Sequence, residues 1–152
     1  MTPRIVVQRD DFDPARIIEG LGGAEIDAGA VASFVGLCRS EEGRLAALEL
    51  EHYPGMAEEE IGRVAAMAAG RWPLLGLSVV HRFGLVRPGE RIVIVACAAR
   101  HRGAALAAIG FMMDFLKTRA PFWKREHLAD GTVGGWVAAA AADDDAMAAW
   151  QA

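Results

Sequence analysis

The chain has 152 residues, a net charge of −4 and an apolar fraction of 53%. This length suits one domain that buries roughly two-thirds of its unfolded surface, and the composition excludes an intrinsically disordered protein. No apolar run reaches the roughly 18 residues of a membrane-spanning helix, and the N-terminus lacks the apolar stretch of a secretory signal. Cys38 and Cys97 lie in apolar runs outside any CxxC motif, so we expect reduced, buried thiols in a cytoplasmic protein.

The first half of the chain combines short strands with one long helix. Asp13-Pro14 predicts a capped helix start, and Leu45–His52 alternates leucine with glutamate, as in a strand with one buried face. Acidic residues in the first turn and an apolar face predict a helix over 57–72, which Pro73 ends. The expected elements are the strand Arg4–Arg9, a short helix from Asp13-Pro14 to Gly22-Gly23, the buried strand Ala30–Cys38, the strand Leu45–His52 and the helix 57–72.

The second half predicts a second long helix over His101–Ala120, with Leu106 among the residues of its core face. The expected strands are 77–83, 91–98, 122–126 and 132–137. Consecutive strands lie close enough in sequence to pair antiparallel, which indicates a single α+β domain over residues 1–140. An Ala-rich tail follows over 141–152, with Asp143-Asp-Asp145 as a candidate helix start.

Positive charge is concentrated between residues 100 and 125, which hold six Lys or Arg and one Asp, whereas the remaining residues sum to −9. A basic pocket on an acidic body favours a small anion over a nucleic acid. Arg100-His101-Arg102 opens the helix, where backbone N–H groups also favour anions. Lys117 and Lys124 flank the helix stop. Clustered cations can activate a neighbouring lysine as a base or nucleophile, but cations near a helix C-terminus also have a purely structural explanation.

Four segments resemble the catalytic (large) subunit family of molybdopterin synthase: Gly29–Arg39, Leu50–Met56, Ala99–Arg102 and Phe111–Glu126. The resemblance implies an α/β hammerhead with an additional antiparallel β-sheet. It implies a sulfurtransferase of molybdenum cofactor biosynthesis that converts cyclic pyranopterin monophosphate to molybdopterin. The sulfur would arrive as the C-terminal Gly-Gly thiocarboxylate of a small ubiquitin-like subunit. The assembly would be a heterotetramer built on a homodimer of the large subunit, without a metal or cofactor.

The same resemblance assigns roles to five residues. Lys117 would assist attack by the thiocarboxylate, and Lys124 would position the substrate or handle protons. Arg39, His101 and Arg102 would bind the phosphate and pterin of the substrate. The acidic residues of the loop after Arg39 are expected to face solvent. An arginine expected in the C-terminal tail is missing, because no arginine follows Arg125.

Two other functions compete with this interpretation. A non-catalytic relative could hold a phosphorylated ligand or a ubiquitin-like tail, although such a protein would be expected to lose one of the two lysines. An RNA-binding domain would need a basic face with exposed aromatic residues, and the acidic remainder of the chain argues against it. We expect His52 and His81 to be structural, and we expect Cys97 to carry no persulfide because it lies within a buried strand.

Overall fold

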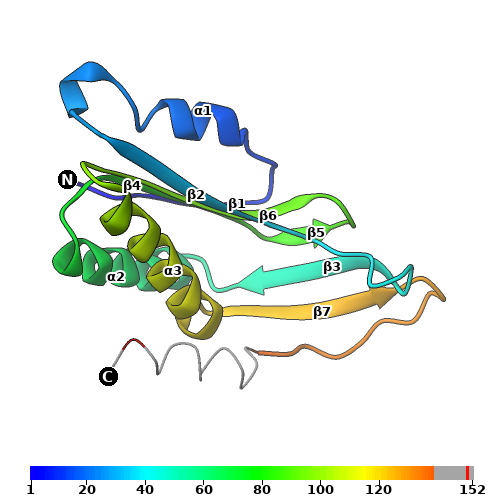
Figure 1. Cartoon of the computed structure of the whole chain (residues 1–152). Helices are drawn as coiled ribbons and strands as arrows, with labels where there is room; N and C mark the ends of the chain where they lie inside the picture. Colours follow the sequence, from blue (N-terminus) through cyan, green and yellow to red (C-terminus); the bar gives the residue numbers. More distant parts are fainter. Residues whose placement is uncertain (139–149, 151–152) are drawn as a thin grey trace.

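The computed structural model describes residues 1–138 and Trp150. Its strands are β1 (Arg4–Gln8), β2 (Ala30–Leu37), β3 (Leu45–His52), β4 (Leu74–Arg82), β5 (Gly84–Val86), β6 (Arg91–Ala99) and β7 (Phe122–Leu128). Its helices are α1 (Pro14–Glu19), the 3-10 turn η1 (Ala24–Ile26), α2 (Met56–Arg71) and α3 (Arg102–Arg119). Sheet A has the strand order β1-β4-β6-β2, and sheet B has the order β5-β3-β7. Figure 1 shows α1 on one face of sheet A and α2 and α3 on the other.

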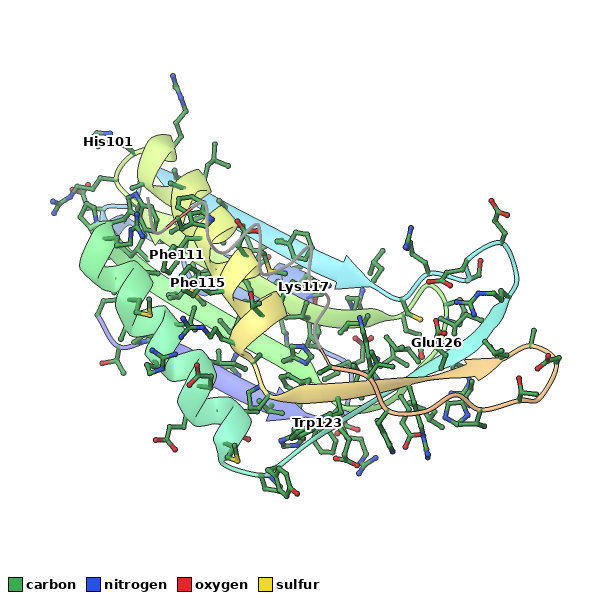
Figure 2. The ribbon with its side chains drawn as sticks, turned by 90° about the horizontal axis from the view of Figure 1, so that it is seen from below. His101, Phe111, Phe115, Lys117, Trp123 and Glu126 are labelled. Carbon is green, nitrogen blue, oxygen red and sulfur yellow. The ribbon has the colours of Figure 1, made fainter. Side chains whose placement is uncertain are left out.

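The main hydrophobic core lies between sheet A and the helices α2 and α3. Ile61 of α2 and Phe111 and Phe115 of α3 are buried there (Figure 2 labels the two phenylalanines). Burial of each such side chain contributes about 1.5–3 kcal/mol. Phe12 and Val80 belong to a smaller core on the α1 face. The predicted fold class is therefore confirmed as a single α+β domain with a second, antiparallel sheet.

Several expectations about strand pairing are wrong. β1 pairs with β4 in parallel, and the consecutive strands β2 and β3 belong to different sheets. The short strand β5 was not predicted. Instead of a strand over 132–137, the structure has isolated bridges at Val133 and Val137. Between them lies Gly134-Gly135, which has no side chains to pack against a neighbouring strand and so disfavours a regular one.

β2 and part of α3 are less buried than their sequences predict. β2 is an edge strand of sheet A, and it leaves Val31, Phe34 and Leu37 exposed at 39%, 38% and 54%. Leu106, expected on the core face of α3, is 63% exposed. An apolar run cannot distinguish an inner strand from an edge strand, and a helix position is buried only where another element covers it.

The predicted boundary at residue 140 and the helix start at Asp143-Asp-Asp145 lie outside the described residues. Trp150 packs its ring edge-on against the rings of Trp72 and Phe111, with ring centroids 5.8 and 5.7 Å away.

Among the residues that the structure describes, no helix is both long enough and apolar enough to cross a membrane.

Gly29 sets how closely the start of β2 approaches the end of β6. Its N–H donates to the carbonyl of Ala99 at 3.0 Å. A Cβ at this position would lie 2.2 Å from the carbonyl oxygen of Arg100. Because the neighbouring atom belongs to the backbone, only a shift of one strand relieves the clash.

We predict that Gly29→Ala lowers the free energy of unfolding by about 1–3 kcal/mol through this overpacking. Gly62→Ala in α2 is the matched control, because a Cβ there meets no atom within 4 Å. Its higher helix propensity should raise stability by about 0.5–1 kcal/mol. Urea denaturation of both variants measures the difference, and equal stabilities would contradict the close approach at Gly29.

Candidate active site

Three of the five predicted site residues, Arg39, Lys117 and Lys124, surround one cavity of about 490 Å³. Arg39 follows β2, Lys117 lies in the last turn of α3, and Lys124 lies on β7. The side chains of all three are exposed, so a ligand from solvent can reach them. Leu45, Leu48 and Ile92 add apolar surface to the wall. The cavity thus lies where the two sheets meet the C-terminal end of α3, which Figure 2 marks with Lys117.

The turn from α3 into β7 brings the two lysines to one cavity. Pro121 disfavours helical conformation in the residue before it, and Ala120 is extended with φ −66° and ψ 125°. Alternate residues of a strand point to the same face, so Lys124 and Glu126 both line the cavity.

The backbone of Lys124 is held on both sides. Lys124 pairs with Leu50 of β3. On its other side, its N–H donates to the Val137 carbonyl at 3.0 Å, and its own carbonyl accepts from the Val137 N–H at 2.7 Å. The ammonium group therefore extends from a fixed point of the sheet.

A narrower cavity of about 110 Å³ is also lined by both lysines, together with His81 and Phe122. The rings of His81 and Phe122 stack with centroids 3.8 Å apart, and His81 Nδ1 lies 2.7 Å from the Arg82 carbonyl oxygen. The pKa of His81 is lowered to about 4, mainly because the ring is buried, and the charge of Lys117 contributes to this shift. His81 is therefore neutral near neutral pH, with Nδ1–H donating to Arg82 and Nε2 able to accept a proton or hydrogen bond.

Sequence reasoning gave His81 a structural role only. Its stacked ring supports that role, but its place beside the lysines was missed. The signal is non-local, because it depends on how β4 lies against the start of β7, and no spacing in the sequence reveals it.

Arg44 pairs with two carboxylates that line the larger cavity. Its Nη2 lies 2.8 Å from Oε2 of Glu126, and it also forms a salt bridge with Glu41. The acids of this loop are exposed to solvent, as expected, and Glu41 in addition lines the cavity. The hydrogen bond from Arg44 lowers the pKa of Glu41, so this carboxylate stays ionised while the guanidinium offsets its charge. Arg44 thus keeps the acids paired beside Lys117 and Lys124.

The basic stretch from 100 to 125 does not form one patch. Arg125 projects to the face of β7 opposite Lys124, with its Nε 2.7 Å from Glu49 and its guanidinium 4.5 Å from the ring of Trp136. Arg119 lies over the ring of Phe115 at 5.6 Å. The alternation of a strand therefore separates neighbours that look like one cluster in the sequence.

His101 and Arg102 lie at the opposite end of α3 (Figure 2). At a rise of about 1.5 Å per residue, the helix from Arg102 to Lys117 spans about 22 Å. Both side chains are exposed. Within one chain, the structure therefore does not bring these two predicted residues to the cavity.

The two cysteines and His52 are buried, which limits their access to a ligand. Burial raises the pKa of Cys97 to about 11 and also raises the pKa of Cys38, so both thiols stay protonated near neutral pH. Neither forms a disulfide, as predicted. His52 is buried with its ring 4.5 Å from that of Phe83, a packing that suits the structural role expected of it. Within residues 1–138 and Trp150, no group of three or more His, Cys, Asp or Glu could hold a metal ion.

A cavity lined by several cations at the junction of two sheets suits the binding of a small anion. The chain matches the family model described as "MoaE protein" over residues 7–119. It is 57% identical over 151 residues to the molybdopterin synthase catalytic subunit of Mesorhizobium japonicum, covering 99% of this chain and 95% of that protein. The chain therefore belongs to the MoaE family of molybdopterin synthase catalytic subunits, which act in molybdenum cofactor biosynthesis. The predicted family and enzyme class are confirmed.

Solved structures share the fold. The molybdopterin cofactor biosynthesis protein E of Burkholderia multivorans is 44% identical, with a TM-score of 0.85 over 100% of this chain and 99% of that chain. Subunits 1 and 2 of the molybdopterin-converting factor of Helicobacter pylori were solved as a complex. A chain of that complex has a TM-score of 0.70 at 18% identity over 93% of this chain and 92% of its own, which shows the fold alone.

We predict that Arg44→Gln raises the KM of the synthase reaction about fivefold. The change leaves Glu41 and Glu126 uncompensated beside the lysines, at a cost of about 1 kcal/mol in binding an anion. Steady-state kinetics measure the effect. Arg63→Gln is the matched control, because it breaks an Arg–Glu pair on α2 that does not line the cavity. An unchanged KM for Arg44→Gln would contradict its role.

Proposed function

We propose that this chain is the catalytic subunit of a molybdopterin synthase. Its cavity would convert cyclic pyranopterin monophosphate to molybdopterin by installing the two sulfurs of the dithiolene. The sulfur would arrive on the C-terminal Gly-Gly thiocarboxylate of a small ubiquitin-like subunit. The observation that carries the proposal is the meeting of Arg39, Lys117 and Lys124 in one cavity, in a chain so similar to named catalytic subunits.

The three cations supply what this chemistry requires. The cyclic phosphate and the thiocarboxylate are both anions and repel each other, and positive charge fixed beside them offsets that repulsion. In the proposal, Arg39 binds the substrate, Lys117 assists attack of the thiocarboxylate sulfur on the substrate, and Lys124 positions the substrate or moves protons. The apolar wall strengthens each charge interaction because it excludes water.

The cavity also suits the tail of a partner protein. Gly134 and Gly135 form part of its wall, and glycine leaves room for the backbone of an extended segment. The solved relative from Helicobacter pylori is itself a complex of two subunits. We therefore propose that the small subunit inserts its C-terminus past this wall toward Lys117 and Lys124.

His101 and Arg102 are proposed to bind substrate in the cavity of a neighbouring copy, since they lie about 22 Å along α3 from Lys117 in their own chain. This role suits the proposed assembly, a homodimer of catalytic subunits within a heterotetramer that carries one small subunit at each end.

We propose that the protein acts in the cytoplasm, because its two free thiols suit a reducing compartment.

A non-catalytic binding module is not favoured, because this chain retains both lysines and holds them on one cavity. RNA binding is not favoured either. Lys124 and Arg125 point to opposite faces of β7, and Arg102 lies at the far end of α3, so the basic residues form no continuous face.

We predict that Lys117→Ala lowers the rate of product formation about a hundredfold or more, because the variant loses a cation beside the reacting atoms. Molybdopterin formation from purified subunits and cyclic pyranopterin monophosphate measures the effect. Arg119→Ala is the matched control, since Arg119 lies in the same helical turn but packs on Phe115. Wild-type turnover by a folded Lys117→Ala variant that binds the small subunit would remove Lys117 from the mechanism.

A further inference from the structure

Two arginines without a partner line a cavity outside the candidate active site. Most arginine side chains of this chain contact an acid, a backbone carbonyl or an aromatic ring. Within residues 1–138 and Trp150, the arginine side chains that make no such contact are those of Arg4, Arg16, Arg39, Arg87 and Arg102. Arg39 and Arg102 belong to the predicted site. Arg4 of β1 and Arg16 of α1 line a separate cavity of about 480 Å³, here called the α1 cavity.

The α1 cavity lies between α1 and sheet A. Alternate residues of a strand point to opposite faces of a sheet, and Val80 of β4 packs in the core on the α1 face. Ser78, two residues earlier, therefore points to the same face, and Arg4 of β1 pairs with it. Leu77 belongs to the core on the other face. Figure 1 shows that α1 covers the face of sheet A opposite α3, which carries Lys117.

The wall of the α1 cavity combines apolar surface with one polar group that lacks a partner. Ile17 and Leu21 of α1 contribute apolar side chains, and Gly76 of β4 contributes backbone only. Ser78 also lines the cavity and is 5% exposed, and its hydroxyl has no hydrogen-bond partner among the described residues. Buried hydroxyl groups are nearly always hydrogen-bonded in folded proteins. Because serine has three staggered rotamers, this hydroxyl can turn toward a ligand in the cavity.

We propose that the α1 cavity binds a small organic monophosphate. The phosphate lies between Arg4 and Arg16, and the apolar body of the ligand lies against Ile17 and Leu21. A carboxylate uses its two oxygens to pair with one guanidinium group. A phosphate has three terminal oxygens and a charge of about −1.5 to −2 near neutral pH, so it accepts from two guanidinium groups at once. The volume of the cavity also suits a small molecule.

A structural role explains only one of the two arginines. Arg16 lies in the last turn of α1, where a cation stabilises the helix, but Arg4 lies on a strand. Asp13 lines an adjoining cavity with both arginines, but its carboxylate caps α1 by accepting from the Ala15 N–H at 3.0 Å. The two guanidinium groups therefore repel each other until an anion binds between them. The inference does not rest on the proposed function, because the α1 cavity shares no lining residue with the candidate active site.

Calorimetric titration with phenyl phosphate tests the site. Any affinity tag belongs at the C-terminus, because Met1 and Thr2 line the cavity. The titrations use the wild-type chain and the double variant Lys117→Ala, Lys124→Ala, in which the candidate active site has lost two of its cations. We expect the double variant to bind one phenyl phosphate per chain, and more tightly than inorganic phosphate because the ring buries apolar surface. No binding by the folded double variant, or equal affinity for the two probes, overturns the proposal.

Arginine variants in the same double-variant chain locate the bound probe. Arg4→Gln and Arg16→Gln should each weaken the binding of phenyl phosphate about tenfold, because each loses charged hydrogen bonds to the phosphate. Arg87→Gln is the matched control, since Arg87 is also exposed and without a side-chain partner but does not line the α1 cavity. Arg4 and Arg16 are exposed, so their variants should fold and, in an otherwise wild-type chain, keep the synthase activity. Equal Kd values for all three variants overturn the proposal.

Ser78→Ala separates binding from folding. The hydroxyl has no partner in the free chain, so its loss should not lower the stability of the free chain. The same change should weaken the binding of phenyl phosphate about threefold to tenfold, because the ligand loses one hydrogen bond. Thermal unfolding and calorimetry measure the two effects. An unchanged Kd, or a loss of stability in the absence of the probe, overturns the role of Ser78 as a ligand contact.

Discussion

The stop of α3 at Pro121 is the constraint on which the rest of the site depends. Ala120 leaves the helix in an extended conformation, and the N–H of Phe122 donates back to its carbonyl at 2.8 Å. The chain therefore turns at once into β7, which pairs with β3 at one edge of sheet B. A longer helix or a looser turn would separate Lys117 from Lys124 and leave the cavity with fewer cations in its wall.

Charge is distributed on the two faces of β7 in opposite ways. On the outer face, Glu49 accepts from Arg125 Nε at 2.7 Å and contacts His127 Nε2 at 2.8 Å, and these hydrogen bonds lower the pKa of Glu49. On that face, the carboxylate of Glu49 is therefore paired with basic side chains of β7. On the cavity face, Glu41 and Glu126 are paired with Arg44, and among the described residues no salt bridge joins either lysine to an acid. The same strand thus separates a structural ion cluster from charges available to a ligand.

Local sequence signals predicted the helices and most strands, because caps, proline stops and periodicity act over a few residues. They could not predict that β2 lies at an edge, that Leu106 stays exposed, or that His81 reaches the lysines, since each depends on contacts between distant segments. The resemblance to a family supplied the expected roles of Lys117 and Lys124 as well as those of Arg39, His101 and Arg102. Only the structure showed that His101 and Arg102 lie at the far end of α3 from Lys117.

The most direct test of the central claim follows the sulfur. The reaction mixture contains the purified chain, cyclic pyranopterin monophosphate and a small subunit whose thiocarboxylate carries isotopically labelled sulfur. The two thiols of the product are then alkylated and analysed by mass spectrometry. The account predicts molybdopterin with the label in both dithiolene sulfurs. A folded chain that binds the small subunit yet forms no product, or forms product without the label, would contradict it.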